Sequence, residues 1–191
     1  RRLAGLNAED IEGIRALAVE LRAAVEAAPI PAEVQKSIAA GLEELGSENP
    51  LAVRSSATDE DQSGSSFAGQ HESYLNVTGY AAVLDRVKGC WASLFTERAL
   101  SYRLRNGLVE QVPVMAVVVQ EMVAAEAAGV MFTADPATSN RRVTSIEAVA
   151  GLGGEFVSGR AIPDSYSVNG GVTTGEVRGT PVLDVGQVRE L

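Results

Sequence analysis

The stretch from Leu51 to Val77 constrains this chain most, because it joins two strand-like segments through a long connection of small and polar residues. It opens with a short apolar run that ends at Arg54, and after Gly69 the pattern becomes strand-like again. Small residues let backbone N–H groups approach a polyanion closely, and hydroxyl groups add further donors. The arginine adds a planar, permanently charged fork for phosphate oxygens. The stretch therefore predicts a site for the phosphates of a nucleotide.

Arg54 admits two interpretations. In the first it contacts phosphates together with loop donors such as Ser65 and Ser66, and charged hydrogen bonds of roughly 1.5–3 kcal/mol each would support micromolar binding. In the second it is a strand-end arginine paired with Asp59 or Glu60, a surface contact worth about 1 kcal/mol or less. The residue pattern alone leaves both open.

The charge balance argues against several classes of partner. The 191 residues include 25 acidic and 16 basic side chains, which gives a formal net charge of −9. Nucleic acids and anionic membranes need a basic surface field, so neither is an expected partner. The single cysteine, Cys90, excludes an internal disulfide and fits a reducing, cytoplasmic compartment. No apolar run approaches the roughly 18 residues of a membrane-spanning helix.

Helical periodicity dominates the first half of the chain. Asn7 is the expected N-cap of a first helix that ends at Pro29, and a second helix is expected from Pro31 to Gly46. A long helical region is expected from Tyr80 to Arg105. The apolar residues expected on the inner faces of these segments are, in order, Ile11, Ile14, Ala18, Leu21 and Val25, then Val34, Ile38, Leu42 and Leu45, then Val83, Val87, Trp91 and Leu94.

Strand-like segments dominate the second half. The run from Val114 to Val119 is wholly apolar and rich in valine, which predicts a strand buried on both faces. A helix start is expected after Asp184. Helices followed by mixed helix and strand predict an α+β or mixed α/β fold. The further expected strands are Ala128–Ala134, Val143–Ala150 and Asp164–Val168.

The end of the valine-rich run is a second candidate site. There the chain passes from valines into Gln120, Glu121, Met122 and Val123. Adenine needs an apolar slot, backbone donors and acceptors for its edge, and sometimes an amide side chain. Gln120–Val123 supplies all three. The alternative is that a strand simply reaches solvent here.

Three weaker candidates have more ordinary explanations. Glu147 is a lone carboxylate in an apolar strand, and we expect it to share a wet face with Ser145 rather than to hold a metal or phosphate. The run Gly151–Gly154 resembles a phosphate loop, but it lacks a following lysine and fits neither dinucleotide-binding nor Walker patterns. His71 is the only histidine and specifies neither a metal site nor a catalytic triad.

Taken in order, five runs resemble one protein family over essentially the whole chain. They read AVRSSATDEDQSGSSFAGQHESYLNVTG, CWASLFTERALSYR, VVVQEMV, AGVMFTADPATSNRR and EAVAGLGGEFVSGRAIPDSY. The sequence resembles the N-terminal ATP-binding domain of the phosphoenolpyruvate synthase and pyruvate phosphate dikinase family. The residues of three of these motifs, SFAGQHESYLN, CWASLFTERA and FTADPATSNR, favour the rifampicin phosphotransferase branch of that family.

The resemblance implies a partial ATP-grasp fold over residues 1–191, with a helical lead-in at 1–49, a nucleotide-binding core at 50–168 and an incomplete C-terminal segment at 169–191. It also implies transfer of the β-phosphate of ATP, with Mg²⁺, to a histidine on a separate swivelling domain. That histidine would pass the phosphoryl group to a small-molecule acceptor, pyruvate or a rifamycin hydroxyl. By motif, Arg54 matches a phosphate-contacting arginine, Gly69 and Ser73 match phosphate-loop positions, and Gln120 matches an adenine contact with Glu121–Val123 as backbone neighbours.

The sequence also departs from the family pattern. A glycine-lysine stretch expected before Arg1 and a carboxylate and Gln-x-Arg segment expected after Leu191 are absent from these residues. His71 lies in the loop motif and is not the expected phosphohistidine. We therefore expect the isolated chain to be inactive and to bind ATP weakly. The alternatives are phosphoenolpyruvate synthase acting on pyruvate, or a non-catalytic nucleotide-binding module.

Overall fold

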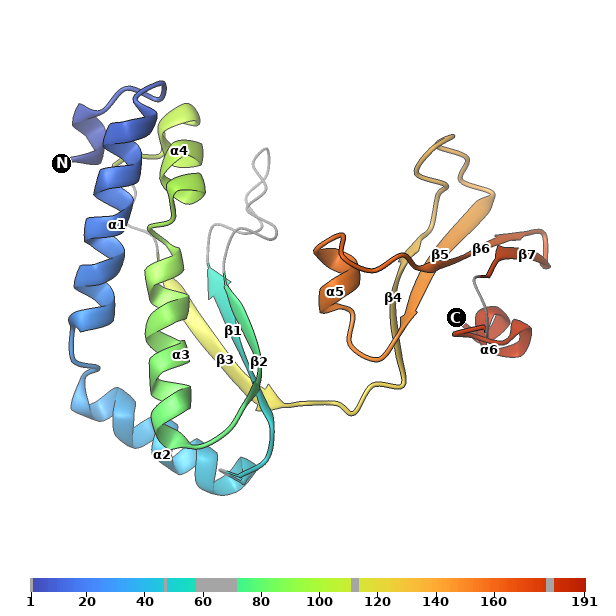
Figure 1. Cartoon of the computed structure of the whole chain (residues 1–191), viewed down its shortest axis with the longest axis horizontal. Helices are drawn as coiled ribbons and strands as arrows, with labels where there is room; N and C mark the ends of the chain where they lie inside the picture. The colour runs from blue at the N-terminus through green and yellow to red at the C-terminus, as the bar shows by residue number, and fades with distance from the viewer. Residues whose placement is uncertain (1, 47, 58–71, 111–113, 178–180) are drawn as a thin grey trace. The chain divides into compact units, whose positions relative to one another are not determined.

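The computed structural model describes residues 2–46, 48–57, 72–110, 114–177 and 181–191 (Figure 1). These residues form two compact units, Arg1–Met122 and Val123–Leu191. Each unit combines helices with an antiparallel sheet, so the α+β class expected from the sequence is confirmed. Within the described residues no helix is long and apolar enough to cross a membrane.

The first unit begins with a short 3-10 helix, Leu3–Gly5, and then α1 (Ile11–Ala27). Asp10 caps α1, because its Oδ1 accepts the Gly13 N–H at 2.9 Å. The prediction that Asn7 is the N-cap is therefore wrong. Asn7 Oδ1 instead accepts the Glu9 N–H at 3.1 Å, which forms a local turn just before the helix.

The later start of α1 changes which of its residues are buried. Ile11 occupies the first helical position and is 59% exposed, although we expected it on the inner face. The buried residues of α1 are Ile14, Leu17 and Ala18. They pack with Leu100 in a cluster distinct from the one beneath the sheet.

The second helix agrees with the sequence signals. α2 (Ala32–Leu45) follows Pro31 and ends at Gly46, whose positive φ of 82° suits glycine. Leu42 is buried, and Val34, Ile38 and Leu45 pack against the core, as expected.

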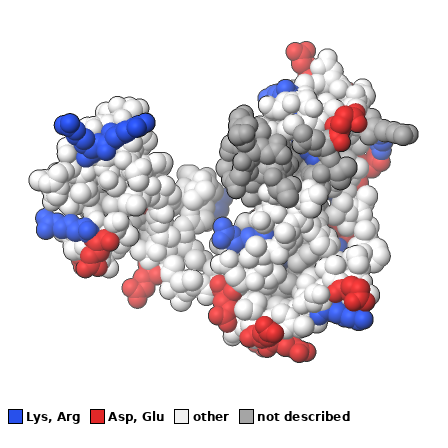
Figure 2. All heavy atoms as spheres, turned by 180° about the vertical axis from the view of Figure 1, so that it is seen from behind, with Lys and Arg blue, Asp and Glu red and all other residues white. Residues whose placement is uncertain are grey.

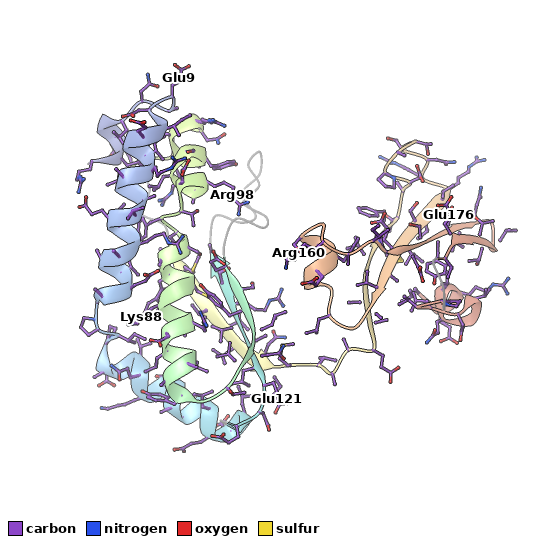
Figure 3. The ribbon with its side chains drawn as sticks, in the orientation of Figure 1. Glu9, Lys88, Arg98, Glu121, Arg160 and Glu176 are labelled. Atoms are coloured by element: carbon purple, nitrogen blue, oxygen red, sulfur yellow. The ribbon has the colours of Figure 1, made fainter. Side chains whose placement is uncertain are left out.

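The expected long helical region is two helices, α3 (Tyr80–Ser93) and α4 (Glu97–Arg105). The region is helical as expected, with one break before α4, where Thr96 acts as an N-cap and its Oγ1 accepts the Ala99 N–H at 3.2 Å. Lys88, labelled in Figure 3, ties α3 to the end of α1 by donating from Nζ to the Glu26 carbonyl at 2.8 Å.

The sheet of the first unit has the order β2-β1-β3, with both pairs antiparallel. Its strands are β1 (Leu51–Ala57), β2 (Ser73–Val77) and β3 (Met115–Glu121). β1 continues beyond Arg54 to Ala57, so Arg54 lies mid-strand and not at a strand end. This extension was missed because Ser55, Ser56 and Ala57 have little strand propensity, yet each pairs with a residue of β3.

β3 lies at the edge of this sheet, and the prediction that it is buried on both faces is wrong. Its residues alternate between half-buried and exposed, and Val118 is 44% exposed. One face of the sheet packs on α2 and α3 around Leu51, Val53 and Val83. In Figure 1, α3 runs beside the strands and α2 crosses near their lower end.

The second unit holds a four-stranded antiparallel sheet in the order β4-β5-β6-β7. Its elements are β4 (Ala127–Phe132), β5 (Val143–Ala150), α5 (Gly154–Val157), β6 (Asp164–Asn169), β7 (Val172–Glu176) and α6 (Val185–Glu190). The sequence indicated β4, β5 and β6 but missed β7, where Gly175 interrupts the strand pattern. Asp184 caps α6 in a capping box with Gln187, which confirms the expected helix start.

Candidate functional site

Three of the sequence-predicted residues, Arg54, Ser73 and Gln120, share the face of the β2-β1-β3 sheet that the helices leave uncovered. Arg54 of β1 lies directly opposite Ser73 of β2 and directly opposite Val118 of β3. Directly opposed residues point to the same side of a sheet, so these three form one row across it. All three side chains are exposed.

Gln120 belongs to the next row of the same face. It lies opposite Ala52, two residues along β1 from Arg54. Such diagonal neighbours have Cα atoms roughly 7–8 Å apart, within reach of long side chains. The face therefore presents a guanidinium, a hydroxyl, an amide and an apolar side chain from three strands.

A bulge in β2 adjoins this face. Two steps along β1, from Leu51 to Val53, correspond to three steps along β2, so β2 carries an extra residue there. Asn76 takes the left-handed conformation, with φ 56°, which asparagine tolerates better than most residues. Bulges bend a strand and re-aim its side chains, and they are common beside functional sites.

The segment after Gln120 is held by backbone contacts. The Met122 N–H donates to the Pro50 carbonyl at 2.9 Å, so this donor is engaged and does not face an adenine edge here. Glu121, labelled in Figure 3 at the end of β3, lies on the opposite side of the sheet and accepts a long hydrogen bond from Asn49 Nδ2 at 3.5 Å. Val123 has a side chain that is 75% exposed.

Several predicted site residues lie outside the described residues. They are Ser65, Ser66, Gly69 and His71, together with Asp59 and Glu60, the alternative ion-pair partners of Arg54. The choice between a phosphate contact and an ion pair for Arg54 therefore rests only on the residues beside it in the sheet. The described part of the chain shows it on the same face as Ser73 and Gln120.

Two titratable groups lie in the core on the opposite side of the sheet, Cys90 buried and Tyr74 partly buried. Cys90 on α3 is fully buried, and its Sγ donates to the Glu72 carbonyl at 3.6 Å. Burial, and then the nearby Glu72 charge, raises the pKa of the Cys90 thiol to about 11. Tyr74 lies beneath Arg86, whose Cζ is 4.8 Å from the ring centroid. Neither group is poised for chemistry.

The second unit carries a polar face of its own. A cavity of about 480 Å³ lies over β5, β6 and β7 and includes Ser145, Glu147, Ser165 and Glu176 in its lining. Glu147 and Glu176 each lie directly opposite Ser165. The expectation that Glu147 shares a wet face with Ser145 is confirmed.

Asp135 lies at the margin of this cavity. Its side chain accepts the Thr138 hydroxyl and N–H, both at 2.7 Å, and the Ser145 hydroxyl at 3.1 Å. These bonds, the Thr138 side chain first, lower the pKa of the Asp135 carboxyl. Among the described residues no group of three or more His, Cys, Asp or Glu side chains is placed to hold a metal ion.

The glycine run of the second unit forms a turn. Gly151 has a φ of 71°, and its N–H donates to the Glu126 carbonyl at 2.8 Å. Nearby, Arg160, labelled in Figure 3, pairs with Glu155 through Nη2 at 3.4 Å.

On the face of the first unit drawn in Figure 2, acidic and basic side chains are interspersed, without an extended field of one sign among the described residues.

Sequence reasoning missed the place of Val118 in the candidate site. Reading β3 as buried on both faces removed any distinction between its alternate valines. The available signal was the switch to Gln120 and Glu121, which marks a strand near solvent. With period-two alternation, Val118 then falls on the same side as Gln120.

Comparison with known proteins places the chain in a nucleotide-binding family. Residues 1–179 match the family described as the pyruvate phosphate dikinase AMP/ATP-binding domain. The chain belongs to this family.

Relatives from two kinds of enzyme are similar to the chain. It is 47% identical over 169 residues to a rifampicin phosphotransferase of Streptomyces sviceus, covering 88% of this chain and 20% of that protein. It is 48% identical over 166 residues to the Bacillus cereus rifampicin phosphotransferase, covering 87% and 19%. It is 44% identical over 168 residues to the phosphoenolpyruvate synthase of Pyrococcus furiosus, covering 85% and 20%. The chain thus spans about a fifth of the length of these relatives.

Proposed function

We propose that this chain is the ATP-binding portion of a dikinase-type phosphotransferase with an ATP-grasp-type fold. The full reaction converts ATP, water and an acceptor into phosphorylated acceptor, AMP and phosphate through a phosphohistidine on a swivelling domain of the same longer protein. The family membership supports ATP as the nucleotide. The slightly higher identity to the rifampicin phosphotransferases supports a rifamycin as the acceptor.

The observation that carries this proposal is the shared exposed face of Arg54, Ser73 and Gln120. Arg54 would hold phosphate oxygens through its guanidinium, and Ser73 would add a hydroxyl donor in the same row. Gln120, one row farther along, would contact the adenine. Val118 lies beside Gln120 on β3, at the opposite end of the Arg54 row from Ser73, and would offer apolar contact for the base or ribose.

The remaining predicted contacts are part of the same proposal. Ser65, Ser66 and Gly69 would supply loop donors to the phosphates, and Glu121–Val123 would border the adenine. Because the Met122 N–H is engaged with Pro50, adenine contacts in this segment would come from other backbone groups of Glu121–Val123.

Magnesium is expected to arrive with the nucleotide. In the described part of the chain no group of three or more His, Cys, Asp or Glu side chains is placed to hold a metal ion. Mg²⁺ typically takes substrate phosphates, waters and only one or two carboxylates as ligands. The contribution to the phosphates that we propose for the described residues is the Arg54 guanidinium and the Ser73 hydroxyl donor.

The test of this function is AMP formation by the complete protein with each acceptor. We expect AMP release from ATP to depend on rifampicin. Dependence on pyruvate instead would favour a phosphoenolpyruvate synthase, the second candidate, which the 44% identity to the Pyrococcus furiosus enzyme supports. ATP binding without AMP formation under either condition would favour a non-catalytic nucleotide-binding module.

A further inference from the structure

The outer edge of β3 carries no paired strand in the part of the chain that the structure describes. Among the described residues β3 pairs only with β1, so every second residue of Met115–Glu121 directs its N–H and C=O away from the sheet. Open edges are usually blunted by lysine, proline, a bulge or a short length. β3 is seven residues long and reads MAVVVQE, with regular pairing to β1 and no lysine or proline. It is therefore a ready template for another strand.

An apolar groove runs beside this edge. It has a volume of about 410 Å³ and lies between α2 and the covered side of β3. A β-carbon added at Gly41 would meet no atom within 4 Å, so the middle of the groove is open space. The apolar side chains that line it are Val34, Ile38, Leu42 and Leu45 of α2 and Val117 and Val119 of β3.

The edge and the groove together favour one kind of occupant. A small molecule filling the groove would leave the strand's backbone groups unpaired. An added strand would satisfy those groups and, because its side chains alternate between faces, would place every second one in the groove. That occupant must therefore be extended in conformation and apolar at alternate positions.

We propose that a segment of the longer polypeptide, outside these 191 residues, pairs along β3 as a fourth strand and fills the groove against α2. The relatives supply the argument for this source, since about four fifths of their length lies outside the part matched by this chain. The inference rests on the proposed function, because it requires that the chain be part of such a longer protein. It extends that function by adding a structural contact that fixes the strand carrying Gln120.

Hydrogen exchange of the β3 amides in the complete protein tests this inference. We expect the outward-facing amides of β3 to be protected in the unmodified protein. Gly41→Trp should fill the groove from the α2 side and speed their exchange by roughly tenfold or more. Ala40→Trp is the matched control, because Ala40 is the adjacent exposed residue of α2 and does not line the groove. It should leave the protection unchanged.

Two results would overturn the inference. One is fast exchange of the outward β3 amides in the unmodified complete protein, which needs no variant and so does not depend on Gly41→Trp folding. The other is protection that rises with protein concentration, which would show a second copy of the chain on this edge. AMP formation by the unmodified protein reports the proposed function separately, so either proposal can fail alone.

Discussion

At the residue scale, strand pairing fixes the backbone of Arg54, and its side chain lies in solvent. Strands pair with it on both sides, through Ser73 and Val118, and its guanidinium lies on the uncovered face. Residues of this kind contribute little to stability, so their substitution separates binding from folding.

We expect Arg54→Ala in the complete protein to change the unfolding free energy by less than about 0.5 kcal/mol. ATP-dependent AMP formation should fall by roughly tenfold or more, because a charged phosphate contact of about 1.5–3 kcal/mol is lost. Arg54→Lys should recover only part of the activity, since a lysine cannot form the planar, two-pronged contact. Steady-state AMP release and thermal unfolding measure the two effects. Near-normal AMP release from Arg54→Ala would contradict the assigned role.

Cys90 makes a second prediction, on pH. Its pKa is raised to about 11 in the folded chain, above the ordinary 9.0, so the folded state holds the proton more tightly than the unfolded state. This contribution to stability is complete below about pH 9 and is lost as the pH rises toward 11. We expect the urea midpoint to fall over this range, and to fall less in Cys90→Ala. An identical pH dependence in both proteins would show that the thiol does not contribute.

At the element scale, helix ends and sheet register decide how the first unit is built. α3 and α4 are separate because Thr96 caps the second of them. The bulge in β2 and the edge position of β3 then fix which side chains share the uncovered face.

We expect Thr96→Ala to destabilise the protein by about 1 kcal/mol, since the first turn of α4 loses the hydrogen bond to the Ala99 N–H. Thr96→Ser keeps the hydroxyl and should cost only a few tenths of a kcal/mol. Urea unfolding monitored by circular dichroism measures both. Equal losses in the two variants would mean that the cap bond is not the cause.

The elements that could be predicted from the sequence carry their signals locally. Pro31 and Gly46 bound α2, and Asp184 marks the start of α6, because caps act within a few residues. The extent of β1 could not be predicted, because Ser55–Ala57 become strand only through pairing with β3, about sixty residues later in the chain. β7 was missed for a different reason: its partner β6 lies just across a Gly-Gly turn, but Gly175 interrupts the strand pattern of β7 itself.

The candidate site was predicted residue by residue but not as a surface. Arg54 and Gln120 were identified from separate motifs, and only the register of β1 with β3 shows that they share a face. The backbone role of Met122 could not be foreseen either, since its N–H donates to Pro50, far away in sequence.

At the scale of the whole molecule, the chain consists of two units, each with its own sheet and its own hydrophobic core. The first presents the Arg54, Ser73 and Gln120 face. The second presents the polar cavity lined by Glu147 and Glu176. Its acidic character argues against direct phosphate contact without an intervening cation. We therefore expect the residues of this chain that contact the nucleotide directly to lie in the first unit.

Photoaffinity labelling of the complete protein with an azido-adenine analogue of ATP tests this claim most directly. The labelled peptide, identified by mass spectrometry, should contain Gln120–Val123, and excess ATP should abolish the labelling. Arg54→Ala should weaken the labelling without moving it, because the arginine is proposed to hold the phosphates. ATP-competed label confined to the strands around Glu147 and Glu176, or no ATP-competed label on this chain, would contradict the account.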